Sequence, residues 1–320
     1  MTAELADKLA FLRASDAFDG VSEVIETHMS WVFLTEARAF KLKKPVRLPY
    51  VDYRTLERRR QSCEREMRLG QRLAANVYEG VVPLVATPRG LAINGMGETV
   101  DWLVVMRRLP AERMLPQMLA RGEATPAHAD AVGELLAGFY GGARHPAWTG
   151  AEYVQRLREV VRVDAGELAE RSSAPADVTR IAGGVLAAID REARSLEARI
   201  GRVVDAHGDL RPEHVCLETP PVVIDPLELD DDLRTLDAAS ELAFLALECE
   251  RLGARWFGER VFARCVACTR DAVPPAVVAI YRAQHALTRA LIALRHVDDA
   301  PLADRARWRA KADDYLARTS

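Results

Sequence analysis

The alternation of hydrophobic and polar positions divides the chain into a part rich in short strands and a longer part rich in helices. In "WVFLTEARAFKLKKPV" (31–46), two strand-like runs flank a turn at Thr35–Arg38, and the second run alternates its side chains. Residues 55–74 follow, with apolar positions near helical spacing and dense charge between them. Further strand-like pieces, punctuated by Gly and Pro, continue to about residue 110. The pattern predicts a small mixed β unit in this part.

Helical patterns dominate the rest of the chain. They cover residues 115–145, 151–171, 177–200, 238–265 and 275–297. One segment, "RVVDAHGDLRPEHVCLETPPVVID" (202–225), reads instead as three short strands separated by a loop and a tight turn. We therefore predict a β-rich N-lobe over residues 1–108 and a larger, mostly helical C-lobe over 109–320, with one embedded hairpin.

Composition and charge narrow the classes of partner. Of 320 residues, 49% are hydrophobic and 28% charged, which is ordinary for a globular protein. A net charge of -3 offers no electrostatic reason for a nucleic-acid or membrane partner. No apolar run approaches the ~18 residues of a membrane span, and the first residues read as a helix rather than a signal peptide.

The five cysteines favour a reducing environment. They are odd in number and lack the spacing of a disulfide framework, so we expect a cytoplasmic protein. "CVAC" (265–268) is interpreted as two core cysteines rather than a zinc or redox site.

The embedded segment carries the candidate chemistry. Asp209 and Asp225 are placed at the ends of neighbouring short strands. Phosphoryl transfer needs one carboxylate to orient and deprotonate an attacking hydroxyl and another to hold Mg²⁺ against nucleotide phosphates. It also needs a cation on the phosphates, and Lys41 and Lys43 point to one face if residues 38–43 form a strand. The competing interpretation is a pair of turn aspartates and solvated lysines.

The sequence resembles a known superfamily in these motifs. "HGDLRPEH" followed by "VVID" resembles the catalytic loop and metal aspartate of the aminoglycoside phosphotransferase and protein-kinase-like superfamily. "THMSWVFLTEARAFKLKKPVRLP", "VIDPLELDDDLRTLDAASELAFLALECERLG" and "YRAQHALTRA" are similar to the kinase-like portion of bifunctional aminoglycoside phosphotransferase/ATP-binding proteins. This resemblance runs from about residue 25 to 297. It implies an α+β, two-lobed protein-kinase-like fold that transfers phosphate from ATP, with Mg²⁺, to a hydroxyl of a small molecule.

The resemblance also implies roles for individual residues of this chain. Asp209 matches the catalytic base, and His207 the loop histidine that braces it. Asp225 matches the metal aspartate. Lys41 is the preferred lysine for the phosphates, and Lys43 is the alternative.

Further roles fall on the elements around the loop. Glu66 is the expected helix partner of the lysine, with Glu64 as the alternative. Backbone near Met106–Arg108 falls where the hinge would bond adenine. Asp237 and Glu241 match acidic residues that brace the catalytic loop.

Three departures from the superfamily pattern bear on function. His214 stands where a metal-binding Asn is usual, which would favour Mn²⁺ or another borderline cation over Mg²⁺ unless Glu213 supplies an oxygen. The turn "THMSW" (27–31) lacks the glycines of a phosphate-covering loop and leaves that task to Ser30 and backbone amides. The bifunctional relatives also carry a P-loop domain, whereas no GxxxxGK[ST] occurs here, so we expect the kinase-like part to act alone.

Three functional classes remain open at this point. The first is a small-molecule kinase. The second is a pseudokinase-like module that binds nucleotide without transferring phosphate. The third is a phosphohydrolase in which a transition metal is held by four side chains: His207, Asp209, His214 and Asp225.

Overall fold

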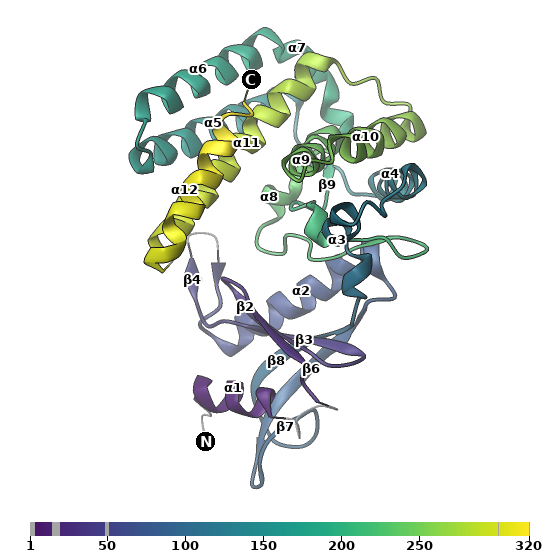
Figure 1. The fold of residues 1–320 in the computed structure, drawn as a ribbon, viewed down its shortest axis with the longest axis vertical. Helices are drawn as coiled ribbons and strands as arrows, with labels where there is room; N and C mark the ends of the chain where they lie inside the picture. The colour runs from purple at the N-terminus through teal and green to yellow at the C-terminus, as the bar shows by residue number, and fades with distance from the viewer. Residues whose placement is uncertain (1–3, 15–19, 49–50, 300, 320) are drawn as a thin grey trace. The chain divides into compact units, whose positions relative to one another are not determined.

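The computed structural model describes residues 4–14, 20–48, 51–299 and 301–319, which form two compact units (Figure 1). Unit 1 contains the chain up to Glu123 together with His207–Asp209 and Glu213–Arg234. Unit 2 contains Ala124–Ala206, Leu210–Pro212 and the chain from Thr235 onward. The division into lobes at residues 108 and 109 remains a prediction.

Unit 1 is built on a six-stranded antiparallel sheet with the strand order β1-β2-β3-β8-β6-β7. Its strands are β1 (Glu23–Glu26), β2 (Ser30–Leu34), β3 (Arg38–Lys43), β6 (Tyr78–Thr87), β7 (Gly90–Ile93) and β8 (Glu98–Arg107). The two strands predicted around Thr35–Arg38 are confirmed as β2 and β3. The Thr35 N–H donates to the Arg38 carbonyl at 2.8 Å and closes the turn between them.

The alternation of β3 gives the sheet two different faces. Leu42 belongs to a core that includes Leu12 of α1 (Leu5–Arg13). Ala39 belongs to a second core that includes Cys63 of α2 (Leu56–Ala74). Because side chains alternate along a strand, Lys41 shares the α2 face with Ala39. The sheet thus directs Lys41 and Lys43 toward one helix.

The predicted helix at 55–74 is confirmed as α2. Thr55 caps its first turn, since the Thr55 Oγ1 accepts from the Arg58 N–H at 3.3 Å. The buried side of α2 carries Cys63, Glu66 and Gly70 at spacings of three and four residues. This face therefore places one acidic side chain toward the sheet.

Smaller elements complete unit 1. They are β4 (Arg47–Leu48) paired with β5 (Val51–Asp52), η2 (Ala111–Arg113), α3 (Leu115–Ala120), the hairpin of β10 (Val215–Cys216) and β11 (Val222–Val223), and α8 (Asp231–Arg234). The last two residues of η4 (Pro212–His214) also belong to unit 1. In the hairpin Val215 lies opposite Val223. Asp225 therefore follows the second strand by two residues.

Unit 2 is mainly helical. Its helices are α4 (Pro126–Gly141), α5 (Gly150–Arg171), α6 (Pro175–Arg191), α7 (Ala193–Glu197), η3 (Ala198–Arg202), α9 (Ala238–Arg251), α10 (Arg255–Thr269), α11 (Pro275–Asp299) and α12 (Leu302–Leu316). Helices α11 and α12 pack side by side (Figure 1). One continuous core joins α5, α6, α9, α11 and α12.

The structure corrects two local predictions. The strand predicted at 202–207 is β9 (Val203–Asp205), and it pairs with β12 (Thr235–Asp237) instead of joining the embedded hairpin. A pattern of alternation specifies a strand but not its partner, which here lies thirty residues along the chain. The prediction of two core cysteines was wrong for Cys268, which is exposed, whereas Cys265 is buried.

No helix in the described part of the chain is both long and apolar enough to span a bilayer.

The contact between Gly70 and Tyr78 yields a stability prediction. A Cβ on Gly70 would lie 2.2 Å from the Tyr78 ring, which is only 2% exposed. Alanine favours a helix by about 1 kcal/mol over glycine, but overpacking a buried ring costs about 1–3 kcal/mol. We expect Gly70→Ala to lower the free energy of unfolding in urea.

Gly166→Ala is the matched control. Gly166 lies on the exposed side of α5, and its Cβ would meet nothing within 4 Å. This variant should gain up to about 1 kcal/mol. Equal effects of the two substitutions would contradict the close packing of Gly70 on Tyr78.

Candidate active site

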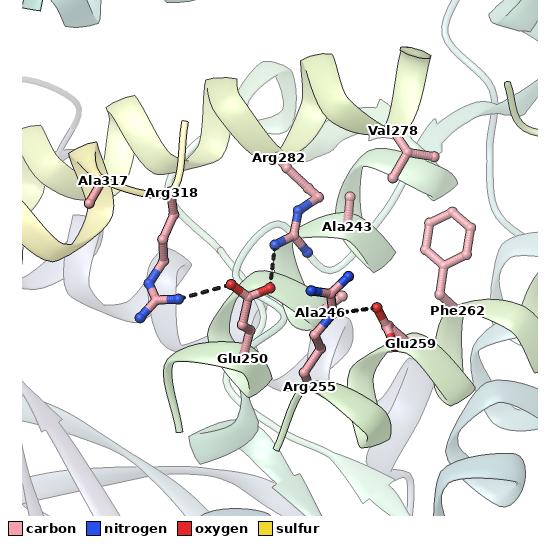
Figure 2. A pocket seen from close by; sticks show the side chains of 10 residues that line it. All are labelled: Ala243, Ala246, Glu250, Arg255, Glu259, Phe262, Val278, Arg282, Ala317 and Arg318. Carbon is pink, nitrogen blue, oxygen red and sulfur yellow. Dashed lines mark hydrogen bonds and ion pairs between the residues drawn. The ribbon is translucent and has the colours of Figure 1, made fainter. Parts of the chain in front are cut away.

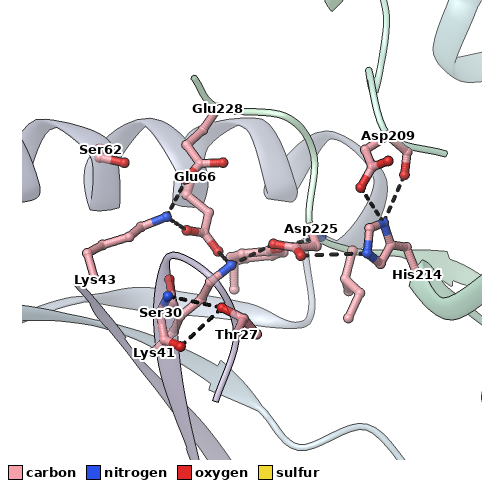
Figure 3. A network of polar contacts seen from close by, with 12 residues as sticks. Thr27, Ser30, Lys41, Lys43, Ser62, Glu66, Asp209, His214, Asp225 and Glu228 are labelled. Atoms are coloured by element: carbon pink, nitrogen blue, oxygen red, sulfur yellow. Dashed lines mark hydrogen bonds and ion pairs between the residues drawn. The ribbon is translucent and has the colours of Figure 1, made fainter. Parts of the chain in front are cut away.

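Lys41 links three segments of unit 1. Its Nζ donates to Glu66 Oε1 at 2.8 Å and to Asp225 Oδ1 at 2.6 Å (Figure 3). The side chain of Glu66 is 1% exposed, whereas that of Asp225 is 43% exposed. Lys41 therefore has one buried and one solvent-exposed carboxylate as partners.

Lys41 and Asp225 are both held in their charged forms. Burial lowers the pKa of Lys41, but the charges of Asp225 and Glu66 outweigh this effect and raise the pKa well above its usual value. Burial raises the pKa of Asp225, but Lys41 and His214 outweigh it and hold the pKa well below the usual range. Asp225 also has φ of 60°, a left-handed conformation that aspartate tolerates better than most residues.

Lys43 binds a different set of acceptors. It donates to Glu66 Oε2 and to Glu228 Oε1 (Figure 3). The Tyr53 hydroxyl also donates to Glu228 Oε1, at 3.0 Å, and accepts from the Ser62 hydroxyl at 2.8 Å. The side chain of Lys43 is 1% exposed, compared with 12% for Lys41. Of the two lysines predicted for phosphate binding, Lys41 is the more accessible.

The structure distinguishes the two glutamates proposed as the helix partner. Glu66 contacts both lysines. Glu64 is exposed and pairs with Arg60 one turn earlier, at 2.9 Å. Sequence reasoning missed Tyr53, and it missed Glu228, the first residue of the acidic run "ELDDD" (228–232).

His207 braces the loop that carries Asp209. The Asp209 N–H donates to His207 Nδ1 at 3.3 Å. Because Nδ1 accepts, the proton lies on Nε2, which donates to the Ile224 carbonyl at 2.9 Å. The imidazole is 1% exposed, and this burial lowers the pKa of His207 to about 4. Both ring nitrogens are engaged, so His207 is not placed to bind a metal.

Gly208 allows the loop to approach the segment after Asp225. Its φ is 86°, and a Cβ there would lie 2.8 Å from Leu227 Cβ. The Leu227 N–H donates to the His207 carbonyl at 2.9 Å. Both the backbone conformation and the close approach require glycine.

His214 lies between the two catalytic candidates. Its Nδ1 donates to the Asp209 carbonyl at 2.8 Å, and its Nε2 is 3.6 Å from Asp225 Oδ2 (Figure 3). His214 Nε2 and Asp225 Oδ2 are therefore close enough to contact one cation.

The turn that carries Ser30 is closed by its own hydrogen bonds. The Ser30 N–H donates to Thr27 Oγ1 at 3.0 Å, and the Thr27 N–H donates to the Ser30 carbonyl at 2.8 Å. Ser30 is also buried. The backbone amide expected to contact phosphate at this position is therefore engaged inside the turn.

The predicted hinge lies at the end of β8. Met106 is paired with Ala39 and Tyr78 in the sheet, and the Arg108 N–H donates to the Ala37 carbonyl at 2.8 Å. For Leu109, the next residue, the described part of the chain supplies no hydrogen bond to the N–H.

Asp237 and Glu241 are buried within unit 2. Asp237 begins α9 by accepting from the Ala239 N–H at 2.8 Å, and it pairs with Arg199. Glu241 accepts from the Tyr140 hydroxyl at 2.7 Å.

The donors of unit 1 fit a divalent cation only together with a ligand. Over residues 4–14, 20–48, 51–299 and 301–319, no three His, Cys, Asp or Glu side chains are grouped to hold a metal ion. Mg²⁺ commonly uses one or two carboxylates and takes its other ligands from phosphates and water. Asp225 can supply such a carboxylate, and the nearby His214 Nε2 adds a nitrogen that suits a softer cation.

Unit 2 contains a separate pocket of about 510 Å³ (Figure 2). In its wall Glu250 accepts from Arg282 at 2.6 Å and from Arg318 at 2.9 Å, and Arg255 donates to Glu259 at 2.6 Å. Within the described residues, none of the side chains predicted for the transfer chemistry lines this pocket. We therefore assign no part of that chemistry to it.

Comparison with known proteins identifies the family to which the chain belongs. The sequence model of the phosphotransferase enzyme family matches residues 34–275, so the chain belongs to this family. Uncharacterized proteins of Mycobacterium tuberculosis and Mycobacterium bovis are each 32% identical over 281 residues, covering 84% of this chain and 54% of theirs. The chain thus spans about half the length of these curated relatives.

Solved structures confirm the predicted α+β protein-kinase-like fold. The choline kinase LicA of Streptococcus pneumoniae superposes with a TM-score of 0.55 at 14% identity, covering 98% of this chain and 99% of that one. The spectinomycin phosphotransferase APH(9)-Ia, solved with ADP and spectinomycin, gives 0.52 at 12% identity, covering 99% and 94%. At these identities the likeness establishes the fold alone.

The buried His207 predicts a pH dependence of stability. Its pKa is about 4 in the folded protein, against an ordinary value of 6.5. The unfolded chain therefore binds the extra proton between these values, and stability that is present above pH 6.5 is lost as the pH falls toward 4. Between pH 6.5 and 4.5 we expect His207 to account for a loss of about 2 kcal/mol.

Urea unfolding of wild type and His207→Gln across this range measures the effect. Carboxylates that titrate in both proteins cancel in the difference. The variant should show the shallower slope, and parallel slopes would mean that the folded state does not disfavour the His207 cation.

Proposed function

We propose that the protein is a small-molecule kinase that transfers the γ-phosphoryl group of ATP to a hydroxyl. The observation that carries the proposal is the Lys41 amine, bonded both to buried Glu66 and to exposed Asp225. A lysine fixed by a helix glutamate beside a metal-binding aspartate is the arrangement that phosphoryl transfer requires. Membership of the phosphotransferase family supports the same reaction class.

In this proposal Lys41 exchanges Asp225 for phosphate oxygens when nucleotide binds. The carboxylate of Asp225, released from the lysine, would then be available to hold a divalent cation, which would supply positive charge against the phosphates. Glu66 keeps Lys41 oriented throughout. Lys41 and Asp225 thus change partners, and each of them remains paired with an opposite charge.

Asp209 is the proposed base. Its carboxylate orients the acceptor hydroxyl and takes its proton as the bond from the hydroxyl oxygen to the γ-phosphorus forms, while the bond from that phosphorus to the β-γ bridging oxygen breaks and ADP leaves. His207 fixes the backbone of Asp209 through the N–H bond at 3.3 Å. Because the pKa of His207 is about 4 and both of its ring nitrogens are hydrogen-bonded, it does not compete with Asp209 as a proton acceptor.

Adenine is proposed to bond backbone groups at the end of β8, near Met106–Arg108 and including the Leu109 N–H. The turn at residues 27–31, whose Ser30 amide is engaged with Thr27, is proposed to lie over the phosphates. The acceptor is proposed to be a hydroxylated small molecule, in keeping with the choline kinase and spectinomycin phosphotransferase that share the fold.

Nucleotide binding and turnover in two aspartate variants test the proposal. Mg·ATP at ~100 times its Kd should stabilise the wild type by about 2.7 kcal/mol. Asp225→Asn should lose most of that gain because the cation loses its charged ligand. Asp209→Asn should keep the gain but transfer phosphate about 10²–10⁴-fold more slowly.

Thermal unfolding with ATP, GTP and ADP, followed by ATP consumption over a panel of hydroxylated metabolites, supplies the measurements. Asp232→Asn, an exposed carboxylate of the same acidic run, is the control and should behave as wild type. Absence of a shift with every nucleotide and divalent metal would refute nucleotide binding. Equal turnover in Asp209→Asn would exclude Asp209 as the base.

The position of His214 predicts which divalent metal supports turnover best. Since its Nε2 lies 3.6 Å from Asp225 Oδ2, we expect turnover to be higher with Mn²⁺ than with Mg²⁺. His214→Asn should shift the preference toward Mg²⁺. An unchanged Mg/Mn ratio would indicate that His214 only braces the loop through Asp209. Wild type that binds nucleotide but is inactive with every metal, and gains activity in His214→Asn, would instead identify a pseudokinase.

A further inference from the structure

The two lysines on the α2 face of β3 differ in what they can reach. Lys41 has an exposed carboxylate, Asp225, among its partners. Both partners of Lys43 are buried, with Glu66 1% and Glu228 7% exposed at the side chain. Moving Lys43 to a phosphate would leave the buried Glu228 carboxylate without its paired cation and Glu66 with Lys41 alone, which is strongly unfavourable in a buried site.

The buried ion pairs form one continuous chain. From Asp225 it runs through Lys41, Glu66 and Lys43 to Glu228, so that negative and positive groups alternate (Figure 3). With all five groups charged, three carboxylates face two lysines and leave one negative charge in excess. That excess lies in a network whose exposed end is Asp225.

Glu228 ties the end of this chain to the rest of unit 1. It follows Asp225 by three residues, and it accepts from Lys43 and from the Tyr53 hydroxyl. Tyr53 is in turn bonded to Ser62 of α2. The segment after Asp225 is thereby fixed to β3 and α2 by contacts that do not involve Lys41.

We propose that Lys43 and Glu228 are positioning residues for the transfer reaction. They hold Glu66 and the Asp225 segment in place, so that Lys41 is free to leave Asp225 for a phosphate. The inference rests on the proposed function and adds a second lysine that never touches the nucleotide. It also assigns Lys43 a role different from the phosphate contact predicted as the alternative to Lys41.

Substitution of Lys43 should lower turnover through its effect on Lys41. In Lys43→Met, Lys41 becomes the single cation among Glu66, Asp225 and Glu228, and these carboxylates hold it more tightly. A cation held in this way aligns the phosphates less well. Misplacement of this kind costs about 10²-fold in rate, so kcat should fall by that factor while the KM for ATP changes much less.

A double-mutant cycle separates positioning from simple stabilisation. Glu228→Gln removes one anchor of the Asp225 segment and should lower kcat less than Lys43→Met does. The double variant Lys43→Met/Glu228→Gln has the same excess of one negative charge as the wild type. Its kcat should therefore be about tenfold higher than that of Lys43→Met alone. Lys44→Met is the matched control, because neighbouring Lys44 pairs with exposed Glu26, and it should leave kcat unchanged.

Two kinetic outcomes would overturn the proposal. If Lys43→Met melts at a lower temperature but its folded fraction keeps the wild-type kcat, Lys43 is only structural. If it raises the Kd for Mg·ATP as strongly as Lys41→Met does, and the double variant does not recover, Lys43 binds phosphate directly.

A second readout does not depend on turnover. Lys41 in nucleotide-free protein can be labelled with an amine-reactive reagent and quantified by peptide mass spectrometry. Its labelling rate should rise from Lys43→Met to wild type to Glu228→Gln, as the negative charge around it decreases. Wild type without nucleotide binding or turnover would refute the proposed function alone, whereas a labelling rate that is equal in the three proteins would refute the positioning role.

Discussion

The buried carboxylate of Glu66 is the constraint on which the candidate active site of unit 1 depends. A charge with 1% of its side chain exposed is tolerable only if it is paired and hydrogen-bonded. Lys41 and Lys43 each take one of its two oxygens. This pairing requires that β3 present both lysines to α2. It also requires the segment after β11 to supply further carboxylates, because two lysines against one glutamate would leave a cation in excess.

Much of this arrangement could be predicted from the sequence because it follows from local periodicity. Alternation along residues 38–43 placed Lys41 and Lys43 on one face, and the structure confirms that they share a partner in Glu66. Helical spacing from Cys63 also favours Glu66 over Glu64 as the buried glutamate, since positions 63, 66 and 70 lie on one side of α2. The order of motifs then indicated the fold, which solved structures that superpose on the chain confirm.

The remaining features depend on contacts between segments that no local pattern specifies. Glu228 begins an acidic run in which local pattern does not distinguish a buried carboxylate from solvated ones, and its contact with Lys43, 185 positions away, accounts for its burial. The pairing of β9 with β12 was missed for the same reason. The Ser30 amide illustrates a different limit: the turn was located correctly, but its internal bond to Thr27 depends on one side-chain rotamer.

The energetics of the linked ion pairs from Asp225 to Glu228 bear on whether the site is catalytically active or has lost its activity. Replacing a buried ion pair by well-packed apolar residues is often neutral or stabilising, whereas leaving one buried charge unpaired costs about 3–5 kcal/mol. Stability alone therefore does not account for five linked ionic groups, three carboxylates and two lysines, from Asp225 to Glu228. A requirement to bind a cation and to present Lys41 to an anion does give such a reason. The loop around His214 departs from the family pattern in one side chain, but the charges that would handle phosphate are complete, and this balance favours catalysis over a binding module.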